Sequence, residues 1–331
     1  RQSVQPGMYV LDNVFAQQMS FLRKNFTLLS LRELLDLWKS GKWNASVRYC
    51  VITFDDGWLD NYRHAYPVLK KFDIPATIFL PTDYVGSDQW FWPDQLALLF
   101  KILAARKITL ETVRELRKLF AEYFDGHGAP FIAAMERGDH VADRIIEHCK
   151  HLPIERIHGL VTALASWLEV SLPQERVIVN WDEVREMSRE GISFGSHSCS
   201  HRILTTITSD DVSVELTRSR QVLLEQGVNY VPVFCYPNGN SDANIQQLVQ
   251  AWIVRGLRRQ LRAEDRVGPG ADDQHTRRTL ELAGKQHEST HQQRADPRRH
   301  SPLLSANEPP EREPGAAVRR LDGGAGGQSQ A

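Results

Sequence analysis

One segment of the chain, residues 48–80, limits the class of fold because it contains two apolar runs separated by a helical pattern. The first run, VRYCVITF, is rich in β-branched and aromatic residues and ends at two adjacent aspartates. The second run, PATIFL, is typical of a buried strand. Between them, NYRHAYPVLKKFD has the spacing of a helix. This order of strand, helix and strand predicts a parallel pair of strands in an α/β fold.

The same order returns near residues 192–239, where GISFGSHSCSH and VPVFCYPNG flank the helical pattern DDVSVELTRSRQVLLEQG. In each case the conspicuous polar groups follow the strand, and in α/β barrels the active site is built at the carboxyl ends of the strands. No glycine-rich phosphate loop favours an open nucleotide-binding sheet instead. We therefore predict a (β/α) barrel.

Residues 86–175 interrupt this repeat with a series of helical patterns and few turn signals. The segments are PDQLALLFKILAARK, LETVRELRKLFAEYF, DHVADRIIEHCKHL and IERIHGLVTALASWLEV. We expect a helical insertion within the α/β domain. A lid, a dimer surface and a membrane-facing cap are all open as its role.

The composition changes abruptly near residue 251. Residues 253–331 contain no Phe, Trp or Tyr, and 13 of the 14 basic residues from Trp252 onward are Arg. Such a segment buries too little apolar surface to offset its ordering entropy. We therefore divide the chain into a domain over residues 1–251 and a low-complexity tail over residues 252–331.

Two explanations of this tail remain open. It is either a natural disordered extension or the product of a shift of reading frame near Ala251, since a GC-rich gene read out of frame yields Arg, Ala, Gly and Pro. In both cases the last strands of the barrel would be missing, so we expect the barrel to be incomplete at its C-terminal end, with exposed strand edges. The coding DNA around codon 251 would decide between the two.

Overall composition excludes some classes of partner. The 331 residues are 41% apolar and 24% charged, with a formal net charge of −1, which is typical of a globular protein without a nucleic-acid or anionic membrane partner. No apolar run is long enough for a transmembrane segment. The chain begins at Arg1, as after processing or truncation, and its four cysteines form no CxxC pair. Free thiols and the lack of a signal peptide favour a cytoplasmic location.

Three polar clusters carry the candidate chemistry: Asp55 with Asp56, His197 with His201, and the turn Tyr236-Pro237-Asn238-Gly239. Two imidazoles and one carboxylate make a three-ligand site for a divalent metal and leave one position open for water, as in catalytic zinc sites. A second carboxylate beside that ligand could take a proton from water as general base. This division of roles explains why two aspartates are adjacent.

Other interpretations account for each signal taken alone. A pair of histidines four residues apart is more often a solvent-facing coincidence, and Asp-Asp after a strand is often a turn or helix cap. Their occurrence together at successive strand ends favours the metal site. The same ligands also fit the iron site of a non-haem oxygenase, although that function leaves Asp55 without a role.

The segments VITFDDGWLDNYRHAYPVLKKFDIPATIFL, GISFGSHSCSH and FCYPNG resemble the polysaccharide deacetylases with a NodB-homology domain, carbohydrate esterase family 4. The resemblance covers about residues 8–250, apart from the insertion. It implies a distorted (β/α) barrel of the NodB type. It also implies a metal-dependent hydrolase that removes an N-acyl group, typically acetyl, from an N-acetylated glycan or other amino sugar.

The resemblance also assigns roles to residues. Asp55 would be the base that activates water, and Asp56, His197 and His201 would hold the metal, usually Zn²⁺. The backbone N–H of Asn238, after Pro237, would stabilise the oxyanion together with the metal. Trp58 and Tyr236 would form walls of the substrate site, although both also fit an ordinary core.

The sequence departs from the family pattern in two places. Cys235 stands where many members have an Arg that orients the base, which bears on the substrate class. A Leu-x-His motif that supplies the general acid is expected beyond residue 251, and the histidines there lie in polar, Arg-rich sequence: His275, His287, His291 and His300. We therefore expect this chain to be poorly folded or weakly active. Hydrolysis of another amide, such as a cyclic imide or ureide, and an inactive product that only binds metal or glycan are the alternatives.

Overall fold

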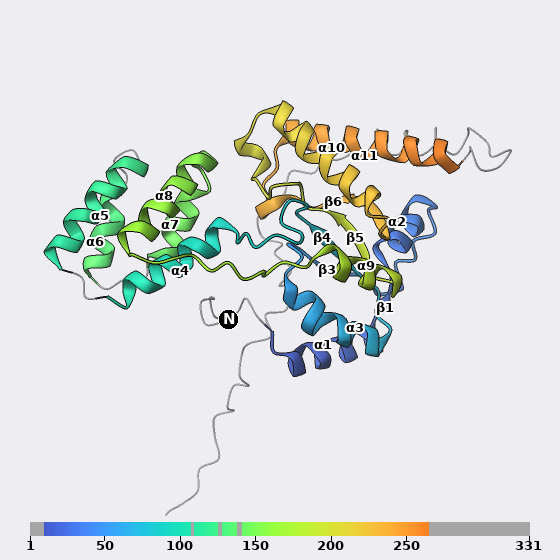
Figure 1. Ribbon diagram of the computed structural model, residues 1–331. Helices are drawn as coiled ribbons and strands as arrows, with labels where there is room; N and C mark the ends of the chain where they lie inside the picture. The colour runs from blue at the N-terminus through green and yellow to red at the C-terminus, as the bar shows by residue number, and fades with distance from the viewer. Residues whose placement is uncertain (1–9, 107–108, 125–127, 138–140, 265–331) are drawn as a thin grey trace, which may run out of the picture. The chain divides into compact units, whose positions relative to one another are not determined.

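The computed structural model describes residues 10–106, 109–124, 128–137 and 141–264 (Figure 1). Its strands are short and all pair in parallel. They are β1 (Thr27–Leu28), β2 (Tyr49–Cys50), β3 (Ile52–Phe54), β4 (Ala76–Leu80), β5 (Ser193–Ser196) and β6 (Tyr230–Phe234).

Helices connect most consecutive strands, as the sequence pattern predicts. They are α1 (Asp12–Asn25), α2 (Leu31–Lys39), α3 (Tyr66–Phe72), α4 (Trp92–Ala104), α5 (Leu110–Tyr123), α6 (Ala129–Glu136), α7 (Ala142–Cys149), α8 (Ile154–Trp167), α9 (Trp181–Arg189), α10 (Ser209–Glu225) and α11 (Ala243–Glu264). A π-helical segment, Asn61–Ala65, precedes α3 directly, and short 3₁₀ turns lie at Leu204–Thr206 and Pro237–Gly239.

The main sheet has the order β3-β4-β5-β6. Its register aligns Leu80 with Ser196 and Ser196 with Phe234, so three neighbouring strands end at the same level. Because all of these strands run in parallel, the loops that follow them meet at one edge of the sheet. Parallel strands joined by helices give the predicted (β/α) barrel-type fold.

The prediction that VRYCVITF forms one strand is wrong, because the structure has two strands there. β2 pairs with β1, whereas β3 pairs with β4, and Val51 separates them. The N–H groups of Thr27 and Leu29 donate to the carbonyls of Arg48 and Cys50 and complete the first pairing. Apolar periodicity reports that residues are extended and buried, but it carries no information on which strand each half contacts.

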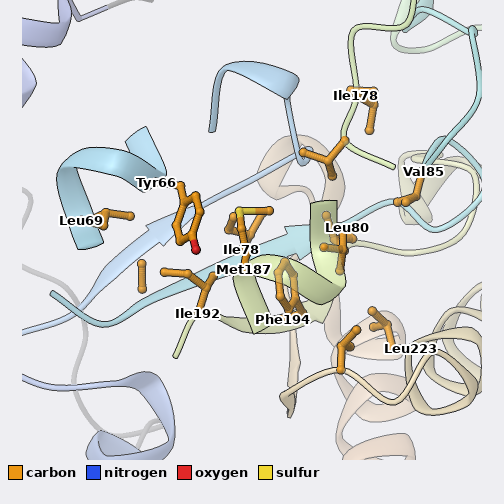
Figure 2. Packing of buried hydrophobic residues seen from close by; sticks show 14 of the residues in the cluster. Tyr66, Leu69, Ile78, Leu80, Val85, Ile178, Met187, Ile192, Phe194 and Leu223 are labelled. Carbon is orange, nitrogen blue, oxygen red and sulfur yellow. The ribbon is translucent and has the colours of Figure 1, made fainter. Parts of the chain in front are cut away.

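Side chains from the sheet and from α3, α9 and α10 form the main apolar cluster (Figure 2). Ile78 lies opposite both Phe54 and Phe194 in the strand register, and Phe194 and Ile78 are almost completely buried. Met187 of α9 and Leu223 of α10 belong to the same cluster. Burial of side chains of this size contributes about 1.5–3 kcal/mol each.

A second apolar cluster consists of residues of α4–α8 and the loops between them. The structure confirms helices at the four helical patterns of the expected insertion. It adds α6, whose sequence APFIAAME has no clear amphipathic period but starts with a proline in its first turn, where proline is well tolerated. We retain an insertion over about residues 86–175 as our proposal for the domain organisation.

The predicted boundary at residue 251 lies inside α11, which continues to Glu264. Trp252, on the tail side of that boundary, is buried with Phe234 and Val249 in a third apolar cluster. Residues 265–331, including His275, His287, His291 and His300, lie outside the described residues, so the proposed origin of the tail stays a prediction. Within the described ranges, no helix has both the length and the apolar character needed to cross a membrane.

Candidate metal centre

The strand ends bring the predicted metal ligands together. Asp56 comes two residues after β3, and His197 comes directly after β5. His201 lies in the loop that follows His197. One ligand atom from each of the three residues lies within 4.8 Å of the others. The residues that the sequence analysis proposed as metal ligands are therefore neighbours in space.

Asp56 Oδ1 is the centre of this group. It lies 3.3 Å from His197 Nε2 and 3.1 Å from His201 Nε2. Burial opposes ionisation of the carboxyl, but the imidazoles of His197 and His201 beside it outweigh burial and hold the pKa of Asp56 well below its usual range. Asp56 is therefore a carboxylate at neutral pH.

The histidine orientations suit a cation. His197 Nδ1 lies 2.9 Å from the carbonyl oxygen of Cys235, which can only accept, so Nδ1 carries a hydrogen and the neutral ring presents a bare Nε2. Within the described part of the chain, Asp56 Oδ1 is buried and receives no well-directed hydrogen bond. A bare nitrogen and a buried carboxylate oxygen repel each other unless a proton or a metal ion lies between them. The residues fit a divalent metal.

The loops that carry these ligands adopt unusual backbone conformations. Asp56 (φ 69°), Ser198 (φ 67°) and His201 (φ 58°) all lie in the left-handed region, which is uncommon for residues other than glycine. Gly57 (φ 66°) follows Asp56, and a Cβ there would clash with Cδ2 of Leu80. The glycine of TFDDG is thus required by both its φ angle and its close approach to β4.

Aromatic residues surround the ligands. Trp58 Nε1 donates a hydrogen bond of 3.1 Å to Asp56 Oδ2, which leaves Oδ1 directed at the histidines. Phe91 packs with its ring centroid 4.6 Å from that of His201 and 5.2 Å from that of Trp58. Phe91 was not among the predicted site residues, because a single aromatic before a helical pattern gives no signal of a functional site. Trp58 was predicted as a substrate wall, and its indole N–H also orients a candidate ligand.

Residues 178–179, which follow α8 in the chain, also support the loop that carries Asp56. Trp58 forms an isolated antiparallel bridge with Ile178, and the N–H of Val179 donates to the carbonyl of Gly57. No role for this stretch follows from the sequence alone. Its short apolar run gives no indication that it would pair with a loop about 120 residues earlier.

Asp55 faces a different partner from Asp56. Its carboxylate is exposed, and Oδ1 lies 3.3 Å from Sγ of Cys235, which donates to it. Burial, together with the adjacent Asp55 carboxylate, raises the pKa of the Cys235 thiol to about 12, so the thiol keeps its proton. Cys235 therefore supplies one neutral donor to Asp55.

A second set of ligand atoms, from Asp55, His197 and Cys235, also lies within 4.8 Å. Metal binding there would require the Cys235 thiolate and would compete for His197, whose Nδ1 already donates to the backbone of Cys235. The set of Asp56, His197 and His201 needs neither change. We therefore take that set as the candidate metal centre.

The Tyr236 turn follows β6 beside the candidate ligands. Tyr236 is half-buried and packs edge-on against Phe234, with ring centroids 5.4 Å apart. Pro237 is buried, whereas Asn238 is exposed with φ 58°, and the turn closes through a hydrogen bond from Gly239 N–H to the Tyr236 carbonyl. The turn thus leaves residue 238 exposed after the end of β6.

Comparison with known protein families gives a match over much of the described chain. A family model described as "Polysaccharide deacetylase" matches residues 42–114 and 159–256, together just over half of the chain. The matched ranges contain the aspartate pair, both histidines and the Tyr236 turn. The unmatched stretch between them lies within the segment that forms α5–α8.

Similar proteins and structures include two curated relatives and one solved structure. Poly-beta-1,6-N-acetyl-D-glucosamine N-deacetylase of Staphylococcus epidermidis is 39% identical over 79 residues, 24% of this chain and 27% of the relative. The enzyme of the same name from Staphylococcus aureus is 36% identical over 89 residues, 27% of this chain and 30% of the relative. The similarity thus spans less than a third of these relatives. The deacetylase PplD of Streptococcus pyogenes aligns with a TM-score of 0.44 and 17% identity over 76% of this chain and 73% of PplD.

Proposed function

Because this chain belongs to the polysaccharide deacetylase family, we propose that it is a metal-dependent hydrolase that removes acetyl groups from the nitrogen of an amino-sugar polymer. The observation that carries this proposal is the convergence of Asp56, His197 and His201, with a second carboxylate, Asp55, next to them. A metal site of this kind with a free base beside it is the set of groups needed to hydrolyse an unactivated amide.

Asp56, His197 and His201 would hold a divalent cation, and we propose Zn²⁺ because imidazole and carboxylate ligands with an open position suit it. When bound, the cation would polarise the acetyl carbonyl and make water more acidic. Trp58 would orient Asp56 through its indole N–H, and the Cys235 carbonyl would orient His197 by accepting from Nδ1. These contacts define the direction in which the ligands point before any cation arrives.

Asp55 would take the proton of the attacking water. It is exposed, so substrate and water can reach it, and its one described side-chain donor is the thiol of Cys235. A neutral thiol holds the carboxylate less strongly than a bidentate guanidinium would. The backbone N–H of Asn238 would donate to the oxygen that becomes negative in the transition state.

The name that both relatives share suggests the first substrate to test, poly-β-1,6-N-acetylglucosamine. The half-buried faces of Trp58 and Tyr236 would contact the sugar ring, since aromatic faces pack well against the apolar face of a pyranose. We propose an N-acetylated glucosamine polymer as the substrate class.

The test is acetate release from oligomers of β-1,6-N-acetylglucosamine by the purified chain, measured with Zn²⁺, with Co²⁺ and after chelation. We expect release that is lost on chelation, restored by metal and abolished in Asp56→Asn. The free amines that appear should equal the acetate released.

Three results would contradict the proposal, each in a different way. Ring opening of cyclic imides or ureides without acetate release would move the same site to another amide substrate. Turnover of 2-oxoglutarate with Fe²⁺ would identify an oxygenase. Stoichiometric metal binding without any hydrolysis would identify an inactive member that only binds metal or glycan.

A further inference from the structure

The loop after β5 holds His201 in a conformation that its own residues do not favour. Ser198 and His201 both have positive φ, with only two residues between them. Each non-glycine residue in this region costs on the order of 1 kcal/mol. A loop with two such residues persists only where neighbouring groups hold it, so its hydrogen-bond partners determine the position of His201.

A buried carboxylate on α10 accepts several hydrogen bonds from this loop. Glu215 is only 8% exposed, and its Oε2 accepts the backbone N–H groups of Cys199 at 2.7 Å and Ser200 at 2.9 Å. Its Oε1 accepts the Ser200 hydroxyl at 2.5 Å. Three donors from two consecutive residues therefore point at one side chain, immediately before His201.

Two carbonyls of the loop are bound by the segment after β4, and the N–H of His201 itself donates to Ser198 Oγ at 3.0 Å. The N–H groups of Thr82 and Asp83 donate to the carbonyls of Ser198 and Cys199 at 3.2 and 3.0 Å. Asp83 in turn pairs with Arg218, one turn of α10 beyond Glu215, at 2.8 Å. Glu215 accepts the N–H groups of residues 199–200, whereas residues 82–83 donate to the carbonyls of residues 198–199. The contacts with residues 82–83 therefore cannot replace those with Glu215.

We propose that Glu215 is a positioning residue for the metal centre, which presents His201 Nε2 toward Asp56 by fixing the backbone of residues 199–200. It acts on the metal through the backbone and touches none of the reacting atoms. Hydrogen bonds to a carboxylate are about twice as strong as neutral ones, which suits a carboxylate as the group that offsets the unfavourable φ angles. This inference rests on the metal centre of the proposed function.

The sequence context of Glu215 fits such a role. It lies in DDVSVELTRSRQVLLEQG, where the neighbouring Val212 and Leu216 pack into the third apolar cluster. A glutamate on the buried face of an amphipathic helix is costly unless hydrogen bonds satisfy it, and here three donors do so. The helical pattern alone predicts an apolar residue at this position.

The experiment measures metal affinity rather than catalysis. The affinity of the whole chain for Co²⁺ is followed by visible absorption, and that for Zn²⁺ by competition with a chromophoric chelator. Glu215→Met keeps most of the side-chain volume and removes every acceptor. We expect its affinity for both ions to fall about 10–100-fold, as for other groups that orient metal ligands. We also expect a changed Co²⁺ spectrum, because His201 would no longer coordinate in the same geometry.

Glu215→Gln is the conservative rescue. Its amide oxygen can accept both backbone N–H groups, and its NH₂ can donate to the Ser200 hydroxyl. We expect an affinity within a few-fold of the unsubstituted chain and an unchanged spectrum. Ser200→Ala removes one of the three donors and should lower the affinity only several-fold. It keeps the proposal testable if Glu215→Met fails to fold.

Leu216→Ala is the matched control for loss of stability. Leu216 is 1% exposed and adjacent to Glu215, but its apolar side chain packs into the third apolar cluster and cannot accept the N–H groups of residues 199–200. We expect Leu216→Ala to lower the Tm at least as much as Glu215→Met does. At temperatures below that Tm, its metal affinity should equal that of the unsubstituted chain. Equal affinity of Glu215→Met and the unsubstituted chain, or an equal loss in Leu216→Ala, would overturn the role of Glu215. Failure of the unsubstituted chain to bind either ion would instead overturn the metal centre itself.

Discussion

The loops at the strand ends and the helices α4–α8 differ in the kinds of side chain that they bury. Every buried polar or charged residue in the described part of the chain belongs to the sheet, its loops or α10: Thr77, Thr82, Ser193, Ser196, His197, Ser198, Glu215 and Ser219. The cluster of α4–α8 consists of apolar side chains such as Leu99, Phe120 and Leu160. The helices stabilise the protein by burying apolar surface, whereas the strand-end loops hold polar groups in buried positions at a cost in stability.

Backbone conformation shows the same difference. Four of the six described non-glycine residues with positive φ lie in the strand-end loops: Asp56, Ser198, His201 and Asn238. The other two, Asp73 and Glu169, follow the ends of α3 and α8, where a left-handed residue is an ordinary way to stop a helix. Strain in the loops therefore coincides with the candidate chemistry, as expected where geometry serves function.

The largest expected effect is a loss of activity, and it distinguishes the roles of Asp55 and Asp56. Asp55→Asn should lower acetate release about 10²–10⁴-fold, the usual contribution of a general base, and leave metal binding and Tm nearly unchanged. Asp56→Asn should abolish both metal binding and activity. Assays of acetate and of bound zinc on both variants test this. Loss of zinc in Asp55→Asn would show that the two carboxylates do not divide their roles.

A cavity in the helices should affect stability alone. Leu160 is fully buried in α8, and Leu160→Ala should lower the free energy of unfolding by about 2–5 kcal/mol through lost burial and a residual cavity. Affinity for Co²⁺, measured well below the Tm, should not change. Denaturant unfolding beside metal titration checks both halves, and a large loss of affinity would mean that the two regions are coupled.

Gly57 tests whether the aspartate loop depends on its backbone. Gly57→Ala places a methyl group against Leu80 Cδ2 at φ 66°, so we expect a loss of about 1–3 kcal/mol in stability and weaker metal binding. Gly191 offers a matched control, since it also has positive φ but no atom lies within 4 Å of the place that a methyl group would take. Gly191→Ala should lower stability without changing affinity.

Trp58→Phe should have a smaller, local effect. It removes the hydrogen bond to Asp56 Oδ2 and keeps the aromatic contact with Phe91. We expect metal affinity to fall by about tenfold, the lower range for groups that orient metal ligands. An unchanged affinity would mean that the indole N–H serves packing only.

The smallest expected change is at Cys235. Cys235→Ala removes the one thiol donor to Asp55 while its backbone carbonyl still binds His197. We expect a several-fold change in the rate of acetate release with no change in metal affinity. A large loss of affinity would instead favour the second set of ligand atoms, which includes Cys235.

Much of this arrangement could be predicted from local patterns. The strands and helices around TFDDG and SHSCSH follow from apolar runs and helical spacing, and their order predicts that Asp56, His197 and His201 meet at one edge of a sheet. Capping chemistry is equally local: Asn180 begins α9 with a capping box, and Gly191, with positive φ, follows its end. Each of these features depends on residues close in sequence.

Contacts between distant residues could not be predicted in this way. The division of VRYCVITF into β2 and β3, the packing of Phe91 on His201 and the pairing of Trp58 with Ile178 depend on which partners the fold supplies. The residues involved look like ordinary apolar positions in the sequence. Their function depends on where the chain brings them.

The sequence by itself determined the class of fold, the candidate ligands and the family, because periodicity and short motifs are local properties of the chain. Only the tertiary structure decided that Asp56 Oδ1 faces both histidines, that a thiol rather than a guanidinium contacts Asp55, and that Glu215 holds the loop of His201. Hydrogen bonds are short and directional. Their partners across 16 to 180 residues of chain therefore become known only once the backbone is placed in space.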